Sequence, residues 1–433
     1  MTTEPAPLAR LADRDARCVW HPYTQHATDT NPLEVVGARG SKLKLADGRE
    51  LVDGISSWWT ILHGHGHPRL VEALATQART LDHVIFAGAT HEPGVRLAER
   101  LTAIAPGPLT RVFFSDNGSA AVEIALKMAY QHHLHRGERE RRVFVTLEGG
   151  YHGDTFGAMS VGDPDPFFEP FRPLLFDVRR VPADAGAIEA ALEELGERAA
   201  GVLLEPLIQG AGGMLMHGAD LVRGARASTT RHGVPLICDE VMTGFGRTGA
   251  LFASAKAGVE PDLLCLAKGL TGGTMPLAVT LAREEIFESF LSPERVRAFF
   301  HGHSFTGHAL GCAVANASLD TIEAEDTPER LEAIGDAIER RLVERLPEEI
   351  ERPRRTGGVV AFDVPTAGAS GYLSDLSPVL RRDALEHGVL LRPLGNTVYA
   401  LPPASLDEEE LESVVSALVS SAVASLDLVR RST

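Results

Sequence analysis

The sequence predicts an α/β protein with a large domain around a mostly parallel central sheet and a smaller α+β domain built from both chain ends. The chain has 433 residues, which is too long for one compact core and suits two domains. Its middle part repeats short apolar runs separated by glycine-rich turns and helical patterns, and such runs are typical of parallel strands covered on both faces. We expect residues 1–60 and 321–433 to form the smaller domain and residues 61–320 the larger one.

Composition and charge exclude several classes of protein. Apolar residues make up 44% of the chain and charged residues 23%, which is ordinary for a globular protein. The net charge of −17 repels phosphate backbones, so we expect no nucleic-acid partner. The four cysteines form no CxxC pair and no cysteine–histidine spacing, which predicts a reduced, cytoplasmic protein without a metal site. We find neither a signal peptide nor an apolar run of the roughly 20 residues that a membrane helix needs, so we expect no membrane partner.

The first elements expected along the chain are a hairpin and the strands of the central sheet. In SKLKLADGRELVDG (residues 41–54), apolar residues alternate around an Asp47-Gly48 turn, which is typical of a β-hairpin. Six later apolar runs predict buried strands. They are RVFF (111–114), RVFVTL (142–147), GVLLE (201–205), VPLICD (234–239), DLLCLA (262–267) and PLAVTL (276–281).

The C-terminal part predicts two helices and two strands. Thr327-Pro328 is expected to cap a helix, whose apolar face carries Leu331, Ile334, Ile338 and Leu342. The runs VLLRPL (389–394) and TVYAL (397–401) resemble strands. A capping box from Ser405 to Glu408 is expected to open the terminal helix, whose apolar face carries Leu411, Val415, Leu418 and Ala422.

A glycine motif in the middle of the chain matches the dinucleotide-binding pattern but lacks its context. Gly244, Gly246 and Gly249 give G-x-G-x-x-G after a predicted strand. A dinucleotide site needs these glycines directly after the strand and an acidic residue at the end of the next strand. Here Asp239 and Glu240 intervene, and the residue just past the end of the next strand is Lys268. The position of the motif therefore argues against a nicotinamide site.

Two charged residues at predicted strand ends are candidates for chemistry. Lys268 follows a buried strand, where it is either a solvated surface charge or, if its pKa is lowered, an amine that can attack an aldehyde. Asp239 ends the preceding strand, where it either caps a helix or pairs with a protonated pyridine nitrogen. Val241 lies two residues further on, so in an extended chain it points the same way and can pack on one face of a ring.

The turns after two other strands predict a place for a phosphorylated ring. Gly118 and Ser119 stand at the start of a predicted helix, which is either a phosphate site or an ordinary serine cap. Tyr151 follows the next strand, at the same edge of the sheet, and its ring can stack on a heteroaromatic ring.

The tryptophans are concentrated near the N-terminus. All three, Trp20, Trp58 and Trp59, fall in the first 60 residues. Adjacent residues of a strand face opposite ways, so at least one ring of the Trp58-Trp59 pair should face a pocket or a subunit interface. A plain core role for the pair is an equal alternative.

Together these segments resemble the class III (ω-) aminotransferases, which carry pyridoxal phosphate on a fold-type-I scaffold. The resemblance runs from HPYT (21–24) to LRPLGNTVYALPP (391–403), nearly the whole chain. Its most specific stretch extends from CDEVMTGFGRTG to LAKGLTGG, with 29 residues from Asp239 to Lys268.

The resemblance implies a role for each candidate. Lys268 would hold the cofactor covalently, and Asp239 would pair with its ring nitrogen. Gly118 and Ser119 would bind the phosphate. Tyr151 would stack on the ring, and Ser304 would reach the phosphate in the neighbouring subunit of a homodimer. The substrate pocket would be lined by Tyr23, Trp58, Trp59 and Arg392. With Lys268 and Asp239, Tyr23 is also expected to be a catalytic residue. The guanidinium of Arg392 suits a carboxylate, although a surface ion pair is nearly as good an interpretation. Glu205 either gates the pocket or caps a turn.

The chain departs from the family in one loop. Family members commonly read H-G-P-T-F where this chain has His301-Gly302-His303-Ser304-Phe305, and the asparagine-proline pair that often follows is His308-Ala309. Ser304 keeps a hydroxyl, so a phosphate contact can survive, but the shape of the loop is in question.

The resemblance implies transfer of an amino group from a donor amine to a keto acid, with small-molecule substrates. Within the class, ornithine, 4-aminobutyrate and lysine remain alternative donors. A non-catalytic module that binds pyridoxal phosphate and a nicotinamide oxidoreductase are the other hypotheses.

Overall fold

A computed structural model describes residues 10–29, 32–163, 168–366, 371 and 374–432 of the chain. Its largest element is a seven-stranded sheet in the order β4-β12-β11-β10-β7-β5-β6. All neighbouring pairs are parallel except those made by β12, which runs antiparallel to both β4 and β11. The strands are β4 (Leu109–Ser115), β5 (Val143–Leu147), β6 (Val178–Val181), β7 (Ala199–Leu204), β10 (Leu236–Asp239), β11 (Leu263–Leu266) and β12 (Ala278–Arg283).

This sheet confirms the predicted mostly parallel core. Successive residues of β10 and β11 alternate between two separate hydrophobic clusters, one on each face of the sheet. All six predicted apolar runs form strands, and the structure adds β6 (Val178–Val181), whose sequence VRRV carries too few apolar residues to be recognised.

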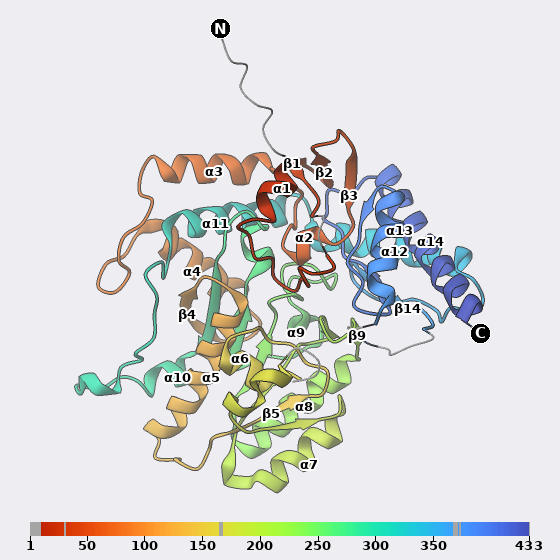
Figure 1. Ribbon diagram of the computed structural model, residues 1–433. Coiled ribbons are helices and arrows are strands. Elements are labelled where there is room, and N and C mark those ends of the chain that lie inside the picture. Colours follow the sequence, from red (N-terminus) through yellow and green to blue (C-terminus); the bar gives the residue numbers. More distant parts are fainter. Residues whose placement is uncertain (1–9, 30–31, 164–167, 367–370, 372–373, 433) are drawn as a thin grey trace.

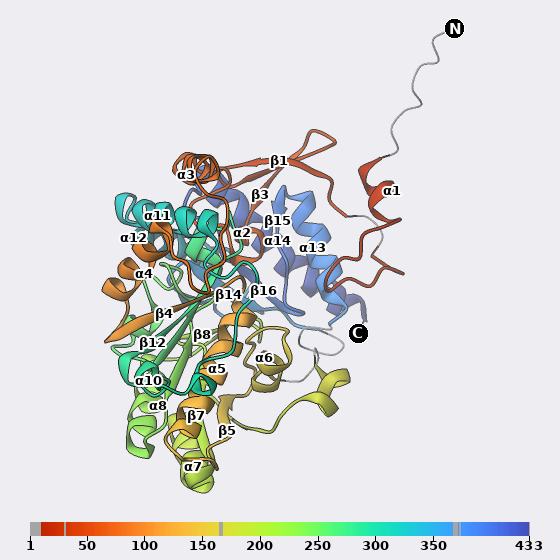
Figure 2. The ribbon, with the colours of Figure 1, turned by 90° about the vertical axis from the view of Figure 1, so that its left-hand side faces the viewer.

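Helices cover both faces of the large sheet (Figures 1 and 2). The helix α5 packs on β11 and β12 on one face, and α7 and α8 pack on β5, β6, β7 and β10 on the other. The helices of this part are α3 (Pro68–Ala78), α4 (Glu92–Ile104), α5 (Gly118–His135), α6 (Phe156–Val161), α7 (Ala185–Leu195), α8 (Ala219–His232), α9 (Ala253–Lys256), α10 (Glu284–Glu288) and α11 (Ala309–Ala324). Short 3-10 turns occur at Glu169–Leu174, Gly196–Arg198, Lys268–Thr271 and Arg295–Arg297.

The two chain ends meet in one small sheet, as Figure 1 shows by the red strands beside the blue helices. Its order is β1-β2-β3-β15, so a C-terminal strand pairs in parallel with an N-terminal one. Its strands are β1 (Val35–Arg39), β2 (Lys42–Leu45), β3 (Glu50–Asp53) and β15 (Val389–Leu390). The predicted hairpin is confirmed, because Leu43 on β2 pairs with Leu51 on β3 across the Asp47-Gly48 turn. The domain limits at residues 60 and 320 stay a prediction.

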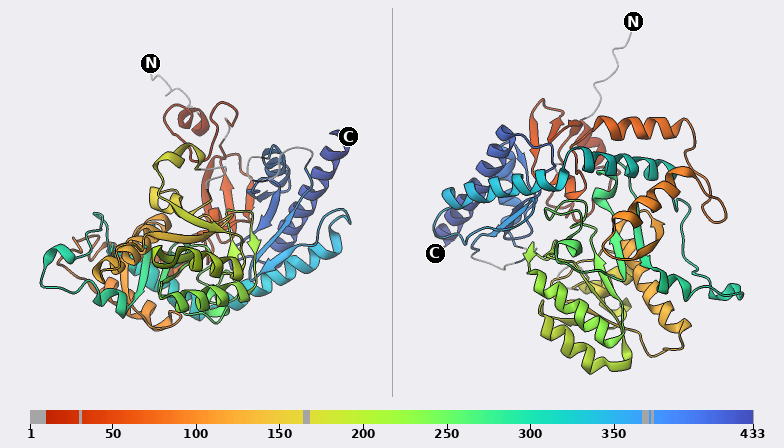
Figure 3. Two further views of the ribbon diagram at one scale, coloured as in Figure 1. Left: turned by 90° about the horizontal axis from the view of Figure 1, so that it is seen from below. Right: turned by 180° about the vertical axis from the view of Figure 1, so that it is seen from behind.

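The rest of the C-terminal part consists of three helices and a second small sheet (Figures 1 and 3). The helices are α12 (Thr327–Arg345), α13 (Leu376–Glu386) and α14 (Glu408–Ser432), and the sheet has the order β13-β14-β16. The remaining elements are β8 (Ile208–Gln209), β9 (Leu215–Met216), β13 (Arg354–Thr356), β14 (Val359–Asp363), β16 (Thr397–Ala400), α1 (Leu11–Asp15) and α2 (Ser56–Trp59). The predicted strand VLLRPL is shorter than expected, since only Val389 and Leu390 form a strand and Leu394 makes an isolated bridge to Thr397.

Both predicted helix caps at the C-terminal end were wrong in detail. The helix α12 is preceded by Asp326 in a left-handed conformation, and the hydroxyl of Thr327 has no hydrogen-bond partner among the described residues. The capping box of α14 is Asp407–Glu410: the Asp407 N–H donates to Glu410 Oε2 at 2.8 Å, and the Glu410 N–H donates to Asp407 Oδ1 at 2.9 Å. Ser405–Glu408 and Asp407–Glu410 have the same spacing, which is that of the capping box. Spacing alone therefore did not distinguish one pair from the other.

The terminal helix is apolar on its inner side. Leu411, Val415, Leu418 and Ala422 are buried as predicted, and α14 packs against α12, α13 and β16. The stretch Glu408–Arg430 is also long and apolar enough to cross a membrane by composition, with 44% of its most apolar window buried inside the protein. We interpret it as a core helix because of this packing.

The position of the capping box can be tested by stability measurements. We expect Asp407→Ala to lower the free energy of unfolding by about 1 kcal/mol, since it removes the side-chain acceptor of the Glu410 N–H. Ser405→Ala is the matched control and should cost nothing, because the buried Ser405 hydroxyl has no partner among the described residues. Thermal denaturation monitored by circular dichroism measures both variants. A larger loss of stability in Ser405→Ala than in Asp407→Ala would show that Ser405 is the cap.

Candidate functional site

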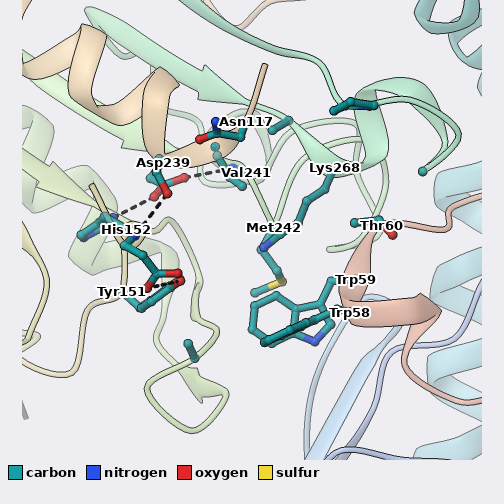
Figure 4. Close-up of a pocket in the computed structure, with 18 of the residues that line it drawn as sticks. Trp58, Trp59, Thr60, Asn117, Tyr151, His152, Asp239, Val241, Met242 and Lys268 are labelled. Carbon is teal, nitrogen blue, oxygen red and sulfur yellow. Dashed lines mark hydrogen bonds and ion pairs between the residues drawn. The ribbon is translucent and has the colours of Figure 1, made fainter. Parts of the chain in front are cut away.

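A pocket of about 580 Å³ lies beyond the carboxyl ends of the parallel strands, where open α/β sheets bind ligands. Segments that follow β4, β5, β7, β10 and β11 form one side of it, and segments from both chain ends form the other (Figure 4). The residues that carry polar or aromatic groups into the pocket include Tyr23, Trp58, Trp59, Asn117, Ser119, Tyr151, His152, Asp154, Glu205, Asp239, Lys268 and Arg392.

Lys268 is the only amine among the described residues that line this pocket. It directly follows Ala267, just beyond the end of β11, and has a positive φ of 45°. Its Nζ lies over the ring of Trp59, 4.4 Å from the centroid. Burial lowers the pKa of Lys268 to about 8, even though the charges of Asp239 and Glu205 act in the opposite direction. The amine is therefore available in its neutral, nucleophilic form near neutral pH.

Asp239 ends β10 and is buried, with 5% of its surface exposed. Its Oδ2 lies 2.8 Å from Nδ1 of His152, and its Oδ1 accepts the Val241 N–H at 3.0 Å. It caps no helix, since the next helix, α9, begins only at Ala253. Figure 4 shows the carboxylate on the opposite side of the pocket from the Lys268 side chain. The structure therefore brings the predicted amine and carboxylate to one pocket.

Val241 reaches the pocket by a different path from the one predicted. The chain does not stay extended after Asp239 but turns, and the buried Glu240 holds the turn by accepting the N–H groups of Ala253 and Ser254. The Val241 side chain then lies against Gly118, where an added Cβ would stand 2.6 Å from Val241 Cγ1. A side chain at position 118 would thus collide with the pocket wall.

The start of α5 lies at the same edge, and its cap differs from the expected one. Asn117 is the cap, with its Oδ1 accepting the Ala120 N–H at 2.9 Å. Ser119 is not the cap, and its Oγ accepts the Asp154 N–H at 3.2 Å. The first turn of a helix presents backbone N–H groups without partners inside the helix, so Gly118 and Ser119 face the pocket at a place that favours an anion.

Two tyrosines converge on Asp154 at the mouth of the pocket. The Tyr23 and Tyr151 hydroxyls donate to Asp154 Oδ1 at 2.5 and 3.0 Å. The Tyr151 ring stacks on Phe168 with its centroid 6.1 Å away. Burial, reinforced by Tyr23 and Asp154, raises the pKa of Tyr151, which keeps its hydroxyl protonated. Tyr23 and Tyr151, far apart in the sequence, are therefore joined through one carboxylate.

The prediction that the Trp58-Trp59 pair lies on a strand was wrong. Ser56, Ser57, Trp58 and Trp59 have φ values of 52°, 45°, 69° and 72°, so the short helix α2 is a left-handed turn. Trp59 is buried, with 4% of its surface exposed, whereas Trp58 keeps 36%. Both rings line the pocket, so the prediction that at least one would do so is confirmed although its reason was wrong.

Arg392 lies next to the tryptophans. Its guanidinium stands over the Trp58 ring, 4.5 Å from the centroid. Among the described residues it makes no ion pair within 4.0 Å, so the alternative of a surface ion pair is not observed. A guanidinium without a carboxylate partner at the wall of a pocket is suited to an acidic ligand.

Ser304 is not brought to this pocket. It is exposed, and the segment that follows α10 and carries it projects from the body of the molecule (Figures 1 and 3). The expectation that it serves a neighbouring subunit therefore stays a prediction.

Sequence reasoning missed His152 and Tyr399, and it left the role of Glu205 open. His152, which contacts Asp239, adjoins the predicted Tyr151, and this adjacency was the available signal. Glu205 accepts the N–H groups of Tyr151 and Gly210, and burial raises its pKa to about 7. Glu205 thus holds two pocket loops. Tyr399 accepts the Nε1–H of Trp59 at 3.0 Å, which only the folded chain reveals.

The low pKa of Lys268 predicts how its reactivity changes with pH. In the cofactor-free protein, a reagent specific for neutral amines should label Lys268 increasingly as pH rises from 7 to 9, since its pKa is about 8. The exposed Lys44 serves as the reference for reagent reactivity in the same sample. Peptide mass spectrometry gives both profiles. Parallel labelling of Lys268 and Lys44 would contradict the lowered pKa.

Comparisons with known proteins agree with this geometry. The family model described as aminotransferase class-III matches residues 23–421. The chain is 48% identical to an adenosylmethionine-8-amino-7-oxononanoate aminotransferase of Synechococcus elongatus over 92% of this chain and 97% of that protein. A crystal structure of the enzyme of that name from Methanocaldococcus jannaschii has a TM-score of 0.90 at 35% identity, covering 96% of this chain and 99% of the other. An amine transaminase from an uncultivated Pseudomonas species, solved with pyridoxal phosphate bound, has a TM-score of 0.86 at 32% identity, covering 94% and 98%.

A match over most of the chain, together with a buried amine facing a buried carboxylate at the strand ends, places this protein in the class III aminotransferase family.

Proposed function

We propose that this protein transfers an amino group from S-adenosylmethionine to 8-amino-7-oxononanoate, which yields 7,8-diaminononanoate in biotin biosynthesis. The observation that carries the proposal is the similarity to enzymes of that name over more than nine-tenths of the chain. Four segments, WHPYTQ, DGISSWW, GYHGDTFGAMSV and EPLIQGAGGM, also resemble that enzyme within the class. Three of them contribute Tyr23, Trp58, Trp59 and Tyr151 to the pocket.

The residues of the pocket fit pyridoxal 5′-phosphate, the cofactor of this family. The amine of Lys268, with its lowered pKa, suits the aldehyde of the cofactor. The buried carboxylate of Asp239 suits the pyridine nitrogen. The helix start at Gly118, which has no Cβ, suits the phosphate. When bound, this cofactor supplies an aldehyde that condenses with amines and a ring that takes up an electron pair. Gly118 and Ser119 would hold its phosphate, and Tyr151 and Val241 would lie against its ring.

Lys268 would act in two ways. Its neutral amine would attach the cofactor, and once displaced by the substrate amine it would carry a proton between substrate and cofactor carbons as general base and then general acid. Its pKa of about 8 suits this task, because both protonation states are accessible near neutral pH. The Trp59 ring beside Nζ would receive the ammonium form through a cation–π contact.

Asp239 would keep the cofactor ring protonated. The carboxylate is buried and is oriented by His152 on one oxygen and by the Val241 N–H on the other. Each oxygen retains acceptor capacity, so the carboxylate can accept a further N–H from a ring nitrogen. His152 and Glu205 would act by holding the loops that carry this carboxylate and Tyr151.

The aromatic side of the pocket would receive the substrates. Trp58, Trp59 and Tyr23 provide apolar surface for the two substrates. Tyr23 packs edge-on against Trp58, with 5.5 Å between the ring centroids. Arg392 would bind the substrate carboxylate with its paired N–H donors. Both substrates would use the same pocket in turn, which predicts ping-pong kinetics.

The proposed enzyme is a homodimer whose subunits share each active site. Its proposed location is the cytoplasm. The projecting segment after α10 carries apolar side chains that are largely exposed: Leu291, Val296, Phe300 and Phe305, at 61%, 75%, 70% and 57%. Such a group of exposed apolar residues is typical of a protein interface. Ser304 lies in this segment, so a second copy would be the source of its phosphate contact.

The proposed reaction can be tested with the two half-reactions. We expect the purified protein to show the visible absorption of bound pyridoxal phosphate, to lose it on addition of S-adenosylmethionine, and to regain it with 8-amino-7-oxononanoate. Ornithine, 4-aminobutyrate and lysine are the comparison donors. A response to one of these alone would assign a different substrate within the class, and no response to any amine would indicate a non-catalytic binding module.

The role of Lys268 can be tested in the same assay. Lys268→Ala should abolish both turnover and the visible absorption, because it removes the attaching amine and the proton carrier. Lys256→Ala, on the nearby helix α9, is the matched control and should leave both unchanged. Full activity in Lys268→Ala would refute the proposed mechanism.

The role of Asp239 predicts a different outcome. Asp239→Asn should retain cofactor but lower kcat by at least about 100-fold, since a neutral amide no longer stabilises a protonated ring nitrogen. The absorption spectrum gives the cofactor content and stopped-flow kinetics the rate. An unchanged rate at full cofactor content would eliminate the proposed pairing.

A further inference from the structure

The left-handed turn Ser56–Trp59 lacks the residue type that normally permits its conformation. None of its four residues is glycine, and all four have φ between 45° and 72°. Residues with a Cβ avoid this region because the Cβ approaches the following carbonyl oxygen, and they enter it as single residues rather than as helical turns. The surrounding structure must therefore hold the turn in place.

Asp53 supplies the acceptors at the start of this turn. Its Oδ1 accepts the Ser57 N–H at 2.9 Å and the Ile55 N–H at 3.4 Å, and its Oδ2 accepts the Ser57 hydroxyl at 2.7 Å. The carboxylate is fully buried at the end of β3, and Nε2 of His65 lies 2.9 Å from Oδ2. One buried carboxylate thus binds the backbone and side chain of the turn.

Different groups fix Ser56 and Trp59, the first and last residues of the turn. The Ser56 hydroxyl donates to the Leu401 carbonyl at 2.8 Å, and the Trp59 Nε1–H donates to the Tyr399 hydroxyl at 3.0 Å. These contacts hold Ser56 and the Trp59 ring, but neither binds Ser57 or Trp58. The Thr60 hydroxyl donates to the Ser57 carbonyl at 3.2 Å. Asp53 binds both the N–H and the hydroxyl of Ser57, the residue immediately before the tryptophans.

The turn determines where both indole rings lie. Trp59 stands 4.4 Å from Lys268 Nζ, and Trp58 stands 4.5 Å from the Arg392 guanidinium. Asp53 does not itself line the pocket. Its influence on the amine and on the carboxylate-binding arginine would pass through these two rings.

We propose that Asp53, together with His65, is a positioning residue of the active site: it holds the left-handed turn Ser56–Trp59 and thereby sets the positions of the Trp58 and Trp59 rings that receive the substrates. The proposal rests on the proposed function only in taking this pocket as the place of catalysis.

The first test reads the indole rings without any substrate. In a Trp20→Phe background, Trp58 and Trp59 are the only tryptophans, so the near-ultraviolet circular dichroism of the holoenzyme near 290 nm reports on this pair. Asp53→Asn should reduce that signal by at least about half, because the amide gives up one acceptor oxygen and mobile rings lose their fixed coupling. The far-ultraviolet spectrum should stay unchanged.

The matched control is Asp262→Asn in the same background. Asp262 is another carboxylate that accepts a backbone N–H, from Leu236 at 2.8 Å, and pairs with Arg226, but it lies at the opposite end of the sheet from the pocket. This variant should lose stability and keep the indole signal. Equal loss of signal in both variants, or none in Asp53→Asn, would overturn the proposal.

The second test uses kinetics and rescue. With whichever donor the wild type accepts, Asp53→Asn should lower kcat/KM roughly ten- to hundredfold, mostly through KM, since the rings bind substrate rather than move the proton. Ser57→Gly should restore part of this loss in the double variant, because glycine enters the left-handed region without penalty. A purely structural role would lower the yield of folded enzyme, leave kcat/KM per bound cofactor unchanged and show no rescue.

The two tests separate this proposal from the proposed function. If S-adenosylmethionine is not the donor, the indole signal and the rescue still decide whether Asp53 holds the turn. If the signal is unaffected while S-adenosylmethionine is turned over, the role of Asp53 is refuted and the function stands.

Discussion

The site depends on the burial of one amine at the edge of a parallel sheet. The carboxyl ends of β5, β7, β10 and β11 converge there, so side chains far apart in the sequence share one small volume. Removal of water from Lys268 disfavours its charged form, and this effect outweighs the attraction of Asp239 and Glu205. The remaining features of the pocket support this balance: Glu205 holds two loops through their N–H groups, and His152 holds Asp239. An amine of lowered pKa and an oriented carboxylate result from the same burial.

The second constraint is that the pocket is closed by both ends of the chain. The Arg247 guanidinium is almost completely buried and donates to the carbonyls of Ile61 and Pro402 at 2.8 Å each, which joins the N-terminal and C-terminal segments. Ser56 is bonded to Leu401, 345 residues further along. The aromatic half of the pocket therefore exists only after these distant segments have met. The GFGRTG segment, which resembles a dinucleotide motif in isolation, has this joining role through Arg247.

Those parts of the fold and site that depend on short-range pattern were predictable. Apolar runs identified the strands of the large sheet, and the ends of two strands identified Asp239 and Lys268, because sheet geometry brings strand ends to one edge. What depends on tertiary contacts was not predictable. Asp407 rather than Ser405 caps α14, although both spacings fit the motif. His152, Glu205 and Arg247 act through partners 87, 54 or more than 150 positions away. The left-handed turn at Trp58 contradicts local preference altogether.

Residues other than glycine with a positive φ show where the fold gives up stability. Ten described residues other than glycine have a positive φ, and four of them, Tyr23, Trp58, Trp59 and Lys268, line the pocket. Left-handed residues cost about 1–2 kcal/mol each. The turn of four is held by hydrogen bonds that it donates to Asp53, the Leu401 carbonyl and the Tyr399 hydroxyl. An ordinary right-handed turn would direct the indoles elsewhere. The fold thus gives up local conformational preference at the residues that face the ligand, because the strained backbone fixes the positions of the indole rings.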